Sequence, residues 1–417
     1  IRVAGVHVGD VWLYLSQSWH LGGPEELRAD SASPAPICTN ASAGVWEHQS
    51  HSRRPRAGLD TGGRWSLYKS PGRYFRNDGY YLGLGLARAT RAPVGVMGLG
   101  ASTLESMTPL EGFMAFEDEL GQLGRTVTVW TPRTERGRQA YLQGIEAIRD
   151  WAEKARRRLR EEGVTFRDIT QPPRLPGPPD YQRAPTTNYN YVTHRFTPAA
   201  IRGIIIQPKT FNVGDPMYLT KAKALIGGLR EAFGRGDLPV CFVQMHSPGR
   251  YERRETEDPN DWVRMRDAQN HLARIPHTTV IATYDLKSTS RSDPDVGLRA
   301  AQWAAAVVGS APVRTGPTYR KHRVDGGNIV VEFDHVGRGL MIGKAEPVTN
   351  GRLRGFQLAG ADGKWRDAEA AIKGNTVVVT CDKLAKPVSV RYAWSPEPSA
   401  ANLYNRAGFP ALPFASP

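Results

Sequence analysis

Short apolar runs alternate with helix-like segments along most of this chain, and this alternation restricts the fold more than any other sequence feature. A first run, Val11–Leu15, is followed by a helix-like segment at 80–91 and a second run at 93–97. The same order then repeats, with predicted strands at 203–207, 239–244 and 278–284 and predicted helices at 218–233, 262–273 and 297–308. Strands joined by helices pair in parallel, so the sequence predicts an α/β fold with ligand-binding loops at the carboxyl ends of its strands.

The pattern changes beyond Gly316, where side chains alternate with the period of two that strands show. Predicted strands at 328–333, 355–359, 376–380 and 388–392 are separated by turns rich in glycine and aspartate. A chain of 417 residues is long enough for two or three domains. We therefore predict an α/β domain over residues 1–313 and a β-rich domain over residues 314–417.

Residues 132–185 do not fit either pattern. Six residues share one face at helical spacing, namely Tyr141, Ile145, Ile148, Ala152, Ala155 and Leu159. They predict one long helix packed against a core, which the proline-rich stretch at 171–179 then ends. Arg156, Arg157 and Arg158 lie mostly on the opposite face, where they offer a docking surface for an acidic partner, an anionic lipid or an anionic polymer. A solvated helix face is the favoured interpretation of this arginine run.

The chain is strongly basic, with a formal net charge of +14. Such a surface attracts phosphates, anionic glycans or an acidic protein. The arginines are dispersed and no zinc-finger or RRM pattern accompanies them, which disfavours nucleic-acid binding. The sequence contains no run of about 18 apolar residues, so it predicts no transmembrane segment.

The sequence predicts no metal site and no cofactor. Three cysteines, Cys38, Cys241 and Cys381, are too far apart for a CxxC motif and allow at most one disulfide. Another three residues, Glu47, His48 and His51, have a loose metal-like spacing. No further ligand follows nearby, so a solvated loop is the favoured interpretation.

Several ordered blocks resemble a known family. Gly9-Asp-Val-Trp-Leu13 followed by Ser16-Gln-Ser18 is similar to the G-D-V-W-L-x-S-G-Q-S-N-M opening of sialate O-acetylesterases, which are SGNH-type carbohydrate esterases. Further matching blocks are Pro93–Gly95, Gly100–Met107, Leu238–Gln244, Arg266–Gln269, Val390–Trp394, Asn402–Asn405 and Gly408–Pro410. The resemblance covers about residues 3–110 and 185–417. It implies an SGNH-hydrolase-like three-layer parallel sheet followed by a C-terminal β-rich domain.

The same resemblance implies roles for individual residues. Ser18 takes the nucleophile position, while Gly100 and Asn212 take the positions that donate to the oxyanion. Asp293, followed by Pro294, stands where the family has its catalytic histidine. An aspartate is a weak base toward a serine hydroxyl, so this departure argues against the family's catalysis.

A second departure precedes Asn212. The family pattern W-Y-Q-G-E-S-N is here Ile206-Gln-Pro-Lys-Thr-Phe-Asn212, so the family's Gln, Gly and Glu are replaced. We expect Pro208, Lys209 and Phe211 to fill or cover the pocket, because glycine no longer gives the substrate access to the backbone.

Two functions follow from these matches and departures. The favoured one is a catalytically impaired esterase-like protein that serves as a binding or structural subunit, with an acetylated glycan or a protein as partner in an extracytoplasmic assembly. The alternative is an active carbohydrate O-acetylesterase that uses Ser18 with a relocated base, His20 or His246, to remove acetyl groups from sialic acid or a polysaccharide. By resemblance alone, the protein is expected to be secreted, periplasmic or bound at the cell surface.

Overall fold

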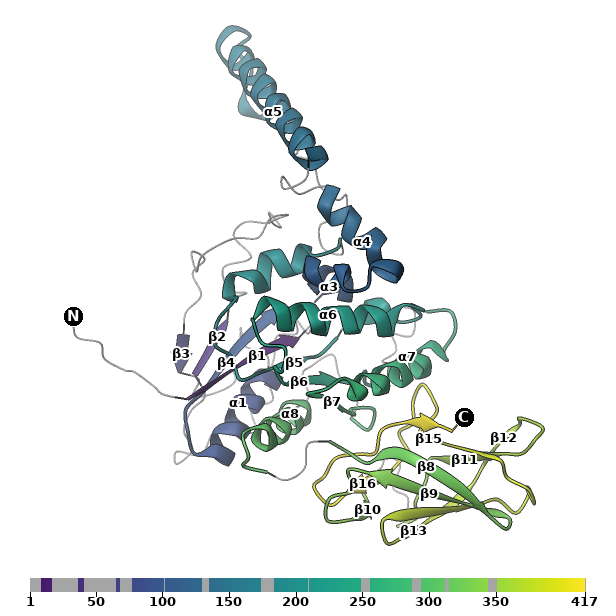
Figure 1. The fold of residues 1–417 in the computed structure, drawn as a ribbon. Coiled ribbons are helices and arrows are strands. Elements are labelled where there is room, and N and C mark those ends of the chain that lie inside the picture. The colour runs from purple at the N-terminus through teal and green to yellow at the C-terminus, as the bar shows by residue number, and fades with distance from the viewer. Residues whose placement is uncertain are drawn as a thin grey trace.

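The chain consists of an α/β part and an antiparallel β part (Figure 1). The computed structural model describes residues 9–16, 37–40, 65–67, 77–100, 102–129, 135–173, 184–208, 210–248, 256–286, 294–311, 315–343 and 351–416. None of the helices in these ranges has both the length and the apolar run that crossing a bilayer requires.

A seven-stranded sheet with the order β3-β2-β4-β1-β5-β6-β7 forms the centre of the α/β part. The strands are β1 (Asp10–Ser16), β2 (Ile37–Asn40), β3 (Trp65–Leu67), β4 (Val94–Gly100), β5 (Gly203–Ile206), β6 (Val240–Val243) and β7 (Thr278–Ile281). All neighbours pair in parallel except β2 and β3, which pair antiparallel. The predicted parallel α/β sheet is confirmed, although the sequence did not predict β2 or β3.

Helices cover both faces of this sheet. On one face lie α1 (Asn77–Thr90) and α8 (Pro294–Val307), and on the other lie α6 (Tyr218–Ala232) and α7 (Asp261–Asn270). Side chains of β1 alternate between the two layers, with Trp12 in the core under α1 and α8 and Leu13 in the core under α6 and α7. The three-layer prediction is confirmed.

Helices α1 and α8 pack very closely because glycine lies at their contact. A Cβ atom on Gly297 would come within 2.2 Å of the Asp78 carbonyl oxygen. The absence of a side chain at Gly297 therefore brings the first turn of α1 against the first turn of α8.

The antiparallel β part has a four-stranded sheet β13-β14-β9-β8, a second four-stranded sheet β12-β11-β15-β17 and the pair β10-β16. Its strands are β8 (Thr318–Asp325), β9 (Asn328–Asp334), β10 (Leu340–Ile342), β11 (Phe356–Ala359), β12 (Trp365–Asp367), β13 (Glu369–Lys373), β14 (Thr376–Thr380), β15 (Ser389–Tyr392), β16 (Leu403–Asn405) and β17 (Phe414–Ala415). The Phe414 ring stacks on Tyr319 with centroids 4.6 Å apart. The predicted C-terminal β-rich architecture is confirmed.

Four helices between β4 and β5 lead away from the sheet. They are α2 (Leu104–Met107), α3 (Leu110–Met114), α4 (Glu117–Val129) and α5 (Glu135–Glu161). Short helical turns are η1 (Phe166–Asp168), η2 (Tyr189–Thr193), η3 (His194–Phe196), η4 (Thr210–Asn212) and η6 (His271–Arg274).

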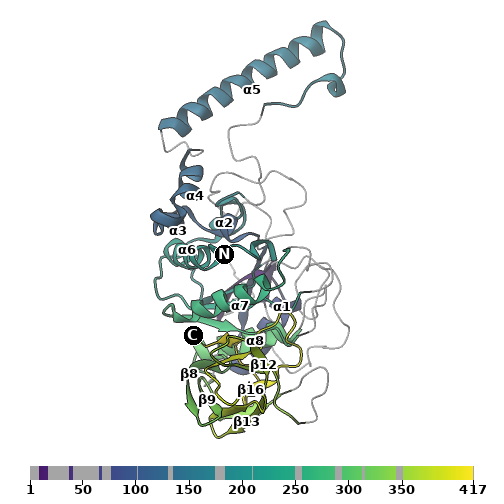
Figure 2. The ribbon, with the colours of Figure 1, turned by 90° about the vertical axis from the view of Figure 1, so that its right-hand side faces the viewer.

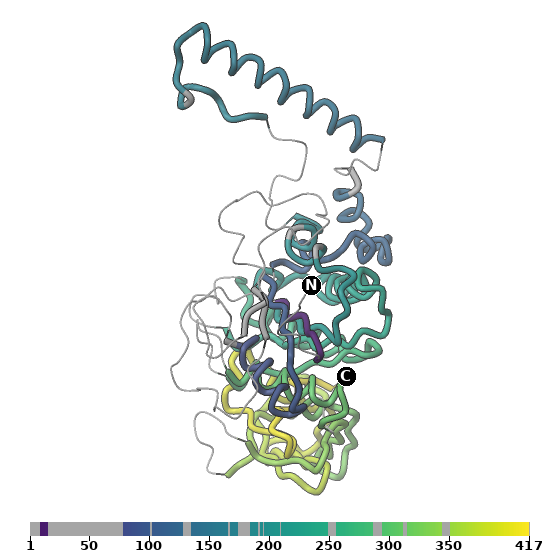
Figure 3. The backbone as a smooth tube through the Cα atoms, turned by 90° about the vertical axis from the view of Figure 1, so that its left-hand side faces the viewer, coloured from purple at the N-terminus to yellow at the C-terminus, as the bar shows by residue number. Residues whose placement is uncertain are grey.

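Helix α5 projects from the body as an arm, at the end of the molecule far from the antiparallel β part (Figures 1, 2 and 3). Among its residues, Gly137 alone is buried. The prediction that this helix packs against a core is therefore wrong. Its 27-residue length and amphipathic spacing were visible in the sequence, but periodicity indicates an apolar face without indicating what covers it.

Candidate functional site

Three of the family-like blocks end side by side at the carboxyl edge of the sheet. Ser16 at the end of β1 is in register with Gly100 at the end of β4, and Leu15 is in register with Ile206 at the end of β5. The Gln207 N–H donates to the Leu15 carbonyl at 2.8 Å, which continues this pairing past β5. The loops that follow β1, β4 and β5 therefore start from one edge, where α/β proteins bind ligands.

Part of the predicted site lies outside the described residues. This applies to Ser18, His20, Asp293 and Lys209, and also to the loosely spaced Glu47, His48 and His51. The roles given to them remain predictions. Of the residues predicted to fill the pocket, Pro208 is buried and Phe211 is half-buried.

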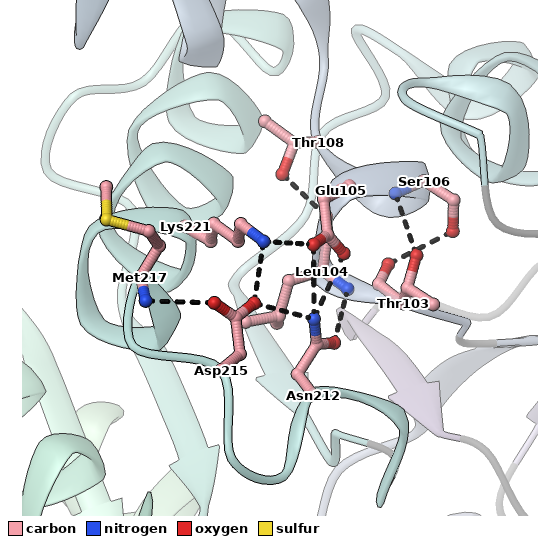
Figure 4. Close-up of polar contacts among 9 residues, drawn as sticks. All are labelled: Thr103, Leu104, Glu105, Ser106, Thr108, Asn212, Asp215, Met217 and Lys221. Atoms are coloured by element: carbon pink, nitrogen blue, oxygen red, sulfur yellow. Dashed lines mark hydrogen bonds and ion pairs between the residues drawn. The ribbon is translucent and has the colours of Figure 1, made fainter. Parts of the chain in front are cut away.

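Asn212 lies in η4 and is 6% exposed (Figure 4). Its Oδ1 accepts from the Leu104 N–H at 3.1 Å, at the start of α2. Backbone N–H groups in the first turn of a helix have no intrahelical partner, so the Asn212 side chain satisfies one of them. The hydroxyl of Thr103 satisfies another, because its Oγ1 accepts from the Ser106 N–H at 3.2 Å.

The amide nitrogen of Asn212 faces two carboxylates. Its Nδ2 donates to Glu105 Oε2 at 3.1 Å and to Asp215 Oδ2 at 3.4 Å. A primary amide has two hydrogens, and each of the two carboxylates lies within hydrogen-bonding distance of this nitrogen. An oxyanion donor must instead point its N–H at the position where the oxyanion forms. In this arrangement Asn212 acts as a link between α2 and the loop before α6.

Lys221 of α6 balances the two carboxylates. Its Nζ lies 2.5 Å from Glu105 Oε1 and 2.6 Å from Asp215 Oδ2, and all three side chains are 14–16% exposed. Burial by itself lowers the pKa of Lys221, but the hydrogen bonds to Asp215 and Glu105 outweigh it and raise the pKa above its usual value. Lys221 therefore stays charged and holds Glu105, Asp215 and Asn212 together as one cluster, which we call the Asn212 cluster.

A second polar group lies on the other face of the sheet. The Tyr14 hydroxyl is 2.7 Å from Gln207 Oε1 and 3.0 Å from Asp78 Oδ2. Asp78 is fully buried in the first turn of α1, close to Gly297. A buried carboxylate thus lies beside the start of α8, the helix that directly follows Asp293 in the sequence. Sequence reasoning missed Asp78, because an acidic residue in the first helical turn is common for reasons of helix polarity alone.

The architecture as a whole is similar to that of a solved esterase structure. The crystal structure of a novel carbohydrate acetylesterase from Xanthomonas citri superposes with a TM-score of 0.69, and the match covers 98% of this chain and 81% of that chain at 24% sequence identity. The chain has the fold of a carbohydrate acetylesterase. A protein from Arabidopsis thaliana matches with a TM-score of 0.33, 12% identity and coverage of 72% of this chain and 98% of that chain.

No family model and no curated protein matches this sequence. The esterase fold supports the predicted resemblance at the level of carbohydrate esterases. It gives no support for sialic acid in particular.

Two of the blocks that resemble the esterase family turn out to join the α/β part to the antiparallel β part. Arg266 of α7 is 1% exposed, and its guanidinium donates to four backbone carbonyls. The acceptors are Met245 at 3.0 Å, His246 at 3.1 Å, Ser395 at 2.8 Å and Pro396 at 2.8 Å. Burial lowers the pKa of Arg266 to about 10. One side chain therefore fixes the loop after β6 to the segment after β15.

Gln269, in the same block, extends this junction. Its Oε1 accepts from the Met245 N–H at 2.8 Å, and its Nε2 donates to the Tyr218 hydroxyl at 2.8 Å. Asn270 continues it by donating to the Pro413 carbonyl. His246, one of the two predicted relocated bases, is therefore placed in a loop whose backbone is fixed at the carboxyl end of β6. Its distance from Ser18 lies outside what the structure describes.

A third junction contact is built around Asp285, just after β7. Arg299 of α8 makes a bidentate pair with it, at 2.8 Å and 2.5 Å, and the Tyr404 hydroxyl donates to Asp285 Oδ2 at 2.5 Å. Burial alone lowers the pKa of Arg299, but Asp285 more than compensates and the pKa is raised. Arg299 and the family-like residue Tyr404 thus share a structural partner, Asp285.

Two of the three cysteines have described side chains. Cys241 is buried in β6 and Cys381 is half-buried, and both are free thiols. Burial raises the pKa of Cys241, which keeps it protonated and unreactive. No three His, Cys, Asp or Glu side chains of the described residues gather as metal ligands.

A cavity of about 820 Å³ lies away from this edge. It is lined by the amino ends of β6 and β7 and by the antiparallel β part, with Asp267, His277, Tyr319 and His335 among its residues. Gly100 and Asn212 lie at the opposite edge of the sheet, so this cavity is separate from the candidate site.

Proposed function

We propose that this protein uses a carbohydrate-esterase fold without efficient ester hydrolysis, and that its pocket binds acetylated glycan or serves a protein partner in an extracytoplasmic assembly. The observation that carries the proposal is the Asn212 cluster. The amide that would donate to an oxyanion is instead held by Glu105 and Asp215.

The sequence at two other positions supports the same conclusion. Asp293 replaces the histidine base, and Pro208-Lys-Thr210 replaces the Gln-Gly-Glu run. Loss of a triad member lowers the rate by roughly 10⁴ to 10⁶. Loss of an oxyanion donor lowers it by roughly another 10² to 10³. Because this chain departs from the family's catalytic residues at separate positions, a binding role is favoured over slow catalysis.

The alternative is an active acetylesterase in which His246 or His20 replaces the missing base. One observation favours it: His246 follows β6 at the same edge of the sheet as Gly100. The substrate would then be an acetyl ester of sialic acid or of a polysaccharide.

Acetyl-ester hydrolysis distinguishes the two functions. We expect the protein to release acetate from p-nitrophenyl acetate and from an acetylated sugar at the same low rate as its Ser18→Ala variant, because no base activates the hydroxyl. The matched control is Ser310→Ala, an exposed serine after α8. A drop of about 100-fold or more in Ser18→Ala, with Ser310→Ala unchanged, contradicts the proposal and supports the active esterase.

A further inference from the structure

The arm formed by α5 exposes apolar surface that the rest of the described chain leaves uncovered. Its 27 residues span roughly 40 Å at about 1.5 Å per residue. Leu142 is 53% exposed and Leu159 is 41% exposed. The rest of the described protein contributes little to the stability of α5, because most helix stability in proteins comes from packing of the apolar face.

The apolar residues of the arm follow a coiled-coil repeat. From Tyr141 to Leu159 the steps between them are alternately four and three residues, through the set Tyr141, Ile145, Ile148, Ala152, Ala155 and Leu159. Alternating steps of this size give the a and d positions of a heptad, which face a second helix. The arm therefore has the pattern of a helix that pairs with another helix.

The chain itself covers one side of this seam. Residues 162–173 return along α5, where the Trp151 indole N–H donates to the Thr170 carbonyl at 2.7 Å (Figure 2). Arg158 donates to the Asp168 carbonyl at 3.1 Å on the same side. The other side stays open, and it consists of Leu142, Ile145, Arg149, Ala152, Arg156 and Leu159. We call these six residues the open strip.

The charges on the open strip are of one sign. Arg149 and Arg156 are exposed, and neither forms an ion pair with a described residue. The nearest acidic residues, Glu146 and Glu153, lie beyond them, about 70° or more around the helix from the centre of the strip. Positions beside a coiled-coil seam select the partner by charge, so this strip selects carboxylates.

A second copy of the arm does not fit. In an antiparallel pair, Arg149 and Arg156 of one helix would face the same arginines of the other, and like charges repel. In a parallel pair they would face the side that carries Trp151 and Arg158, which residues 162–173 already occupy. A helix of a different chain therefore suits the open strip better than a second copy of the arm does.

We propose that the open strip of α5 binds an acidic amphipathic helix of a protein partner. Leu142, Ile145 and Leu159 contact its apolar residues, and Arg149 and Arg156 pair with its glutamates or aspartates. Arginine suits this role because its guanidinium binds a carboxylate through two parallel hydrogen bonds. Within the predicted Arg156–Arg158 cluster, Arg156 alone belongs to the strip.

Binding of a synthetic helix to the full chain tests the proposal. The probe is a peptide of about four heptads with Leu at a and d and Glu at e and g, and its control carries Lys at e and g. At physiological salt we expect the Glu peptide to bind at least about tenfold more tightly than the Lys peptide. The double variant Arg149→Glu with Arg156→Glu should reverse that order.

The matched control is Lys154→Glu with Arg157→Glu, which changes the net charge of the same helix equally but lies off the strip. It should bind the Glu peptide as the parent does, and circular dichroism should show equal helix content in all three proteins. Equal loss of binding in both double variants would overturn the proposal. So would arginine-dependent binding to phosphatidylglycerol-containing vesicles without binding of the Glu peptide, which would assign the strip to a membrane surface.

Discussion

Replacing Arg266 by methionine will lower the free energy of unfolding by about 3 to 5 kcal/mol, the range seen when one partner of a buried charged contact is removed. Methionine retains much of the volume but donates no hydrogen bond. Four carbonyls, those of Met245, His246, Ser395 and Pro396, would lose their donor. Each unsatisfied buried carbonyl costs on the order of 1 kcal/mol or more, and loss of the buried cation offsets part of that cost. Urea unfolding measures the change.

Arg264 provides the control for this experiment. It lies on the same helix, but its side chain is 57% exposed and it pairs with Asp258 and Asp261 at the surface. Exposed ion pairs contribute about 1 kcal/mol or less, so Arg264→Met should leave stability nearly unchanged. Equal effects of the two substitutions would show that Arg266 does not fix the junction.

Replacing Lys221 by methionine will destabilise the protein by about 2 to 4 kcal/mol, somewhat less than a fully buried pair because the cluster is partly exposed. The substitution leaves Glu105 and Asp215 facing one another across Asn212 without a cation. Their repulsion will separate α2 from the loop before α6. The measurement is again urea unfolding, with Lys223→Met on the same helix as control.

A second substitution makes this prediction specific. Glu105→Gln in the Lys221→Met background removes one of the two uncompensated charges and should restore part of the lost stability, although Glu105→Gln alone destabilises the parent. Additive losses in the double variant would mean that Lys221 and Glu105 do not interact, and the cluster would lose its role in holding Asn212.

The central sheet was predictable because its strands are bounded by local signals. Val11–Leu15 and 93–97 are apolar runs that end in Ser- or Gly-rich turns, and the structure has β1 and β4 there. Strands β2 and β3 escaped prediction because Ile37–Asn40 and Trp65–Leu67 contain no apolar run, unlike the equally short β5 and β6. Strands of this kind depend on their neighbours in the sheet more than on their own sequence.

The candidate site was less predictable than the sheet. Asn212 and Glu105 each lie in a family-like block, but nothing in the sequence indicated that they contact each other or Lys221. Glu105 is 107 residues from Asn212 along the chain, and hydrogen bonds over such separations follow no period. The sequence thus indicated where Asn212 lies in the fold. Only its hydrogen bonds in the structure showed that it links α2 to the loop before α6.

The family-like blocks fall into two groups according to where their residues lie in the structure. Gly100 and Asn212 lie at the edge where ligands bind in this fold class, whereas Arg266 and Tyr404 hold the α/β part against the antiparallel β part. The blocks that contain Arg266 and Tyr404 therefore indicate a shared architecture and carry no information about catalysis. The fold was therefore predicted more securely than the reaction.

The reactivity of Ser18 toward a fluorophosphonate tests the central claim most directly. Such a reagent phosphonylates a serine when a nearby base takes the hydroxyl proton and fluoride leaves, so it reports the activated nucleophile without needing the natural substrate. The chain and its Ser18→Ala variant are incubated with the reagent, and modified peptides are identified by mass spectrometry. We expect Ser18 to react no faster than Ser310, whereas rapid stoichiometric labelling at Ser18 that disappears in Ser18→Ala would contradict the account.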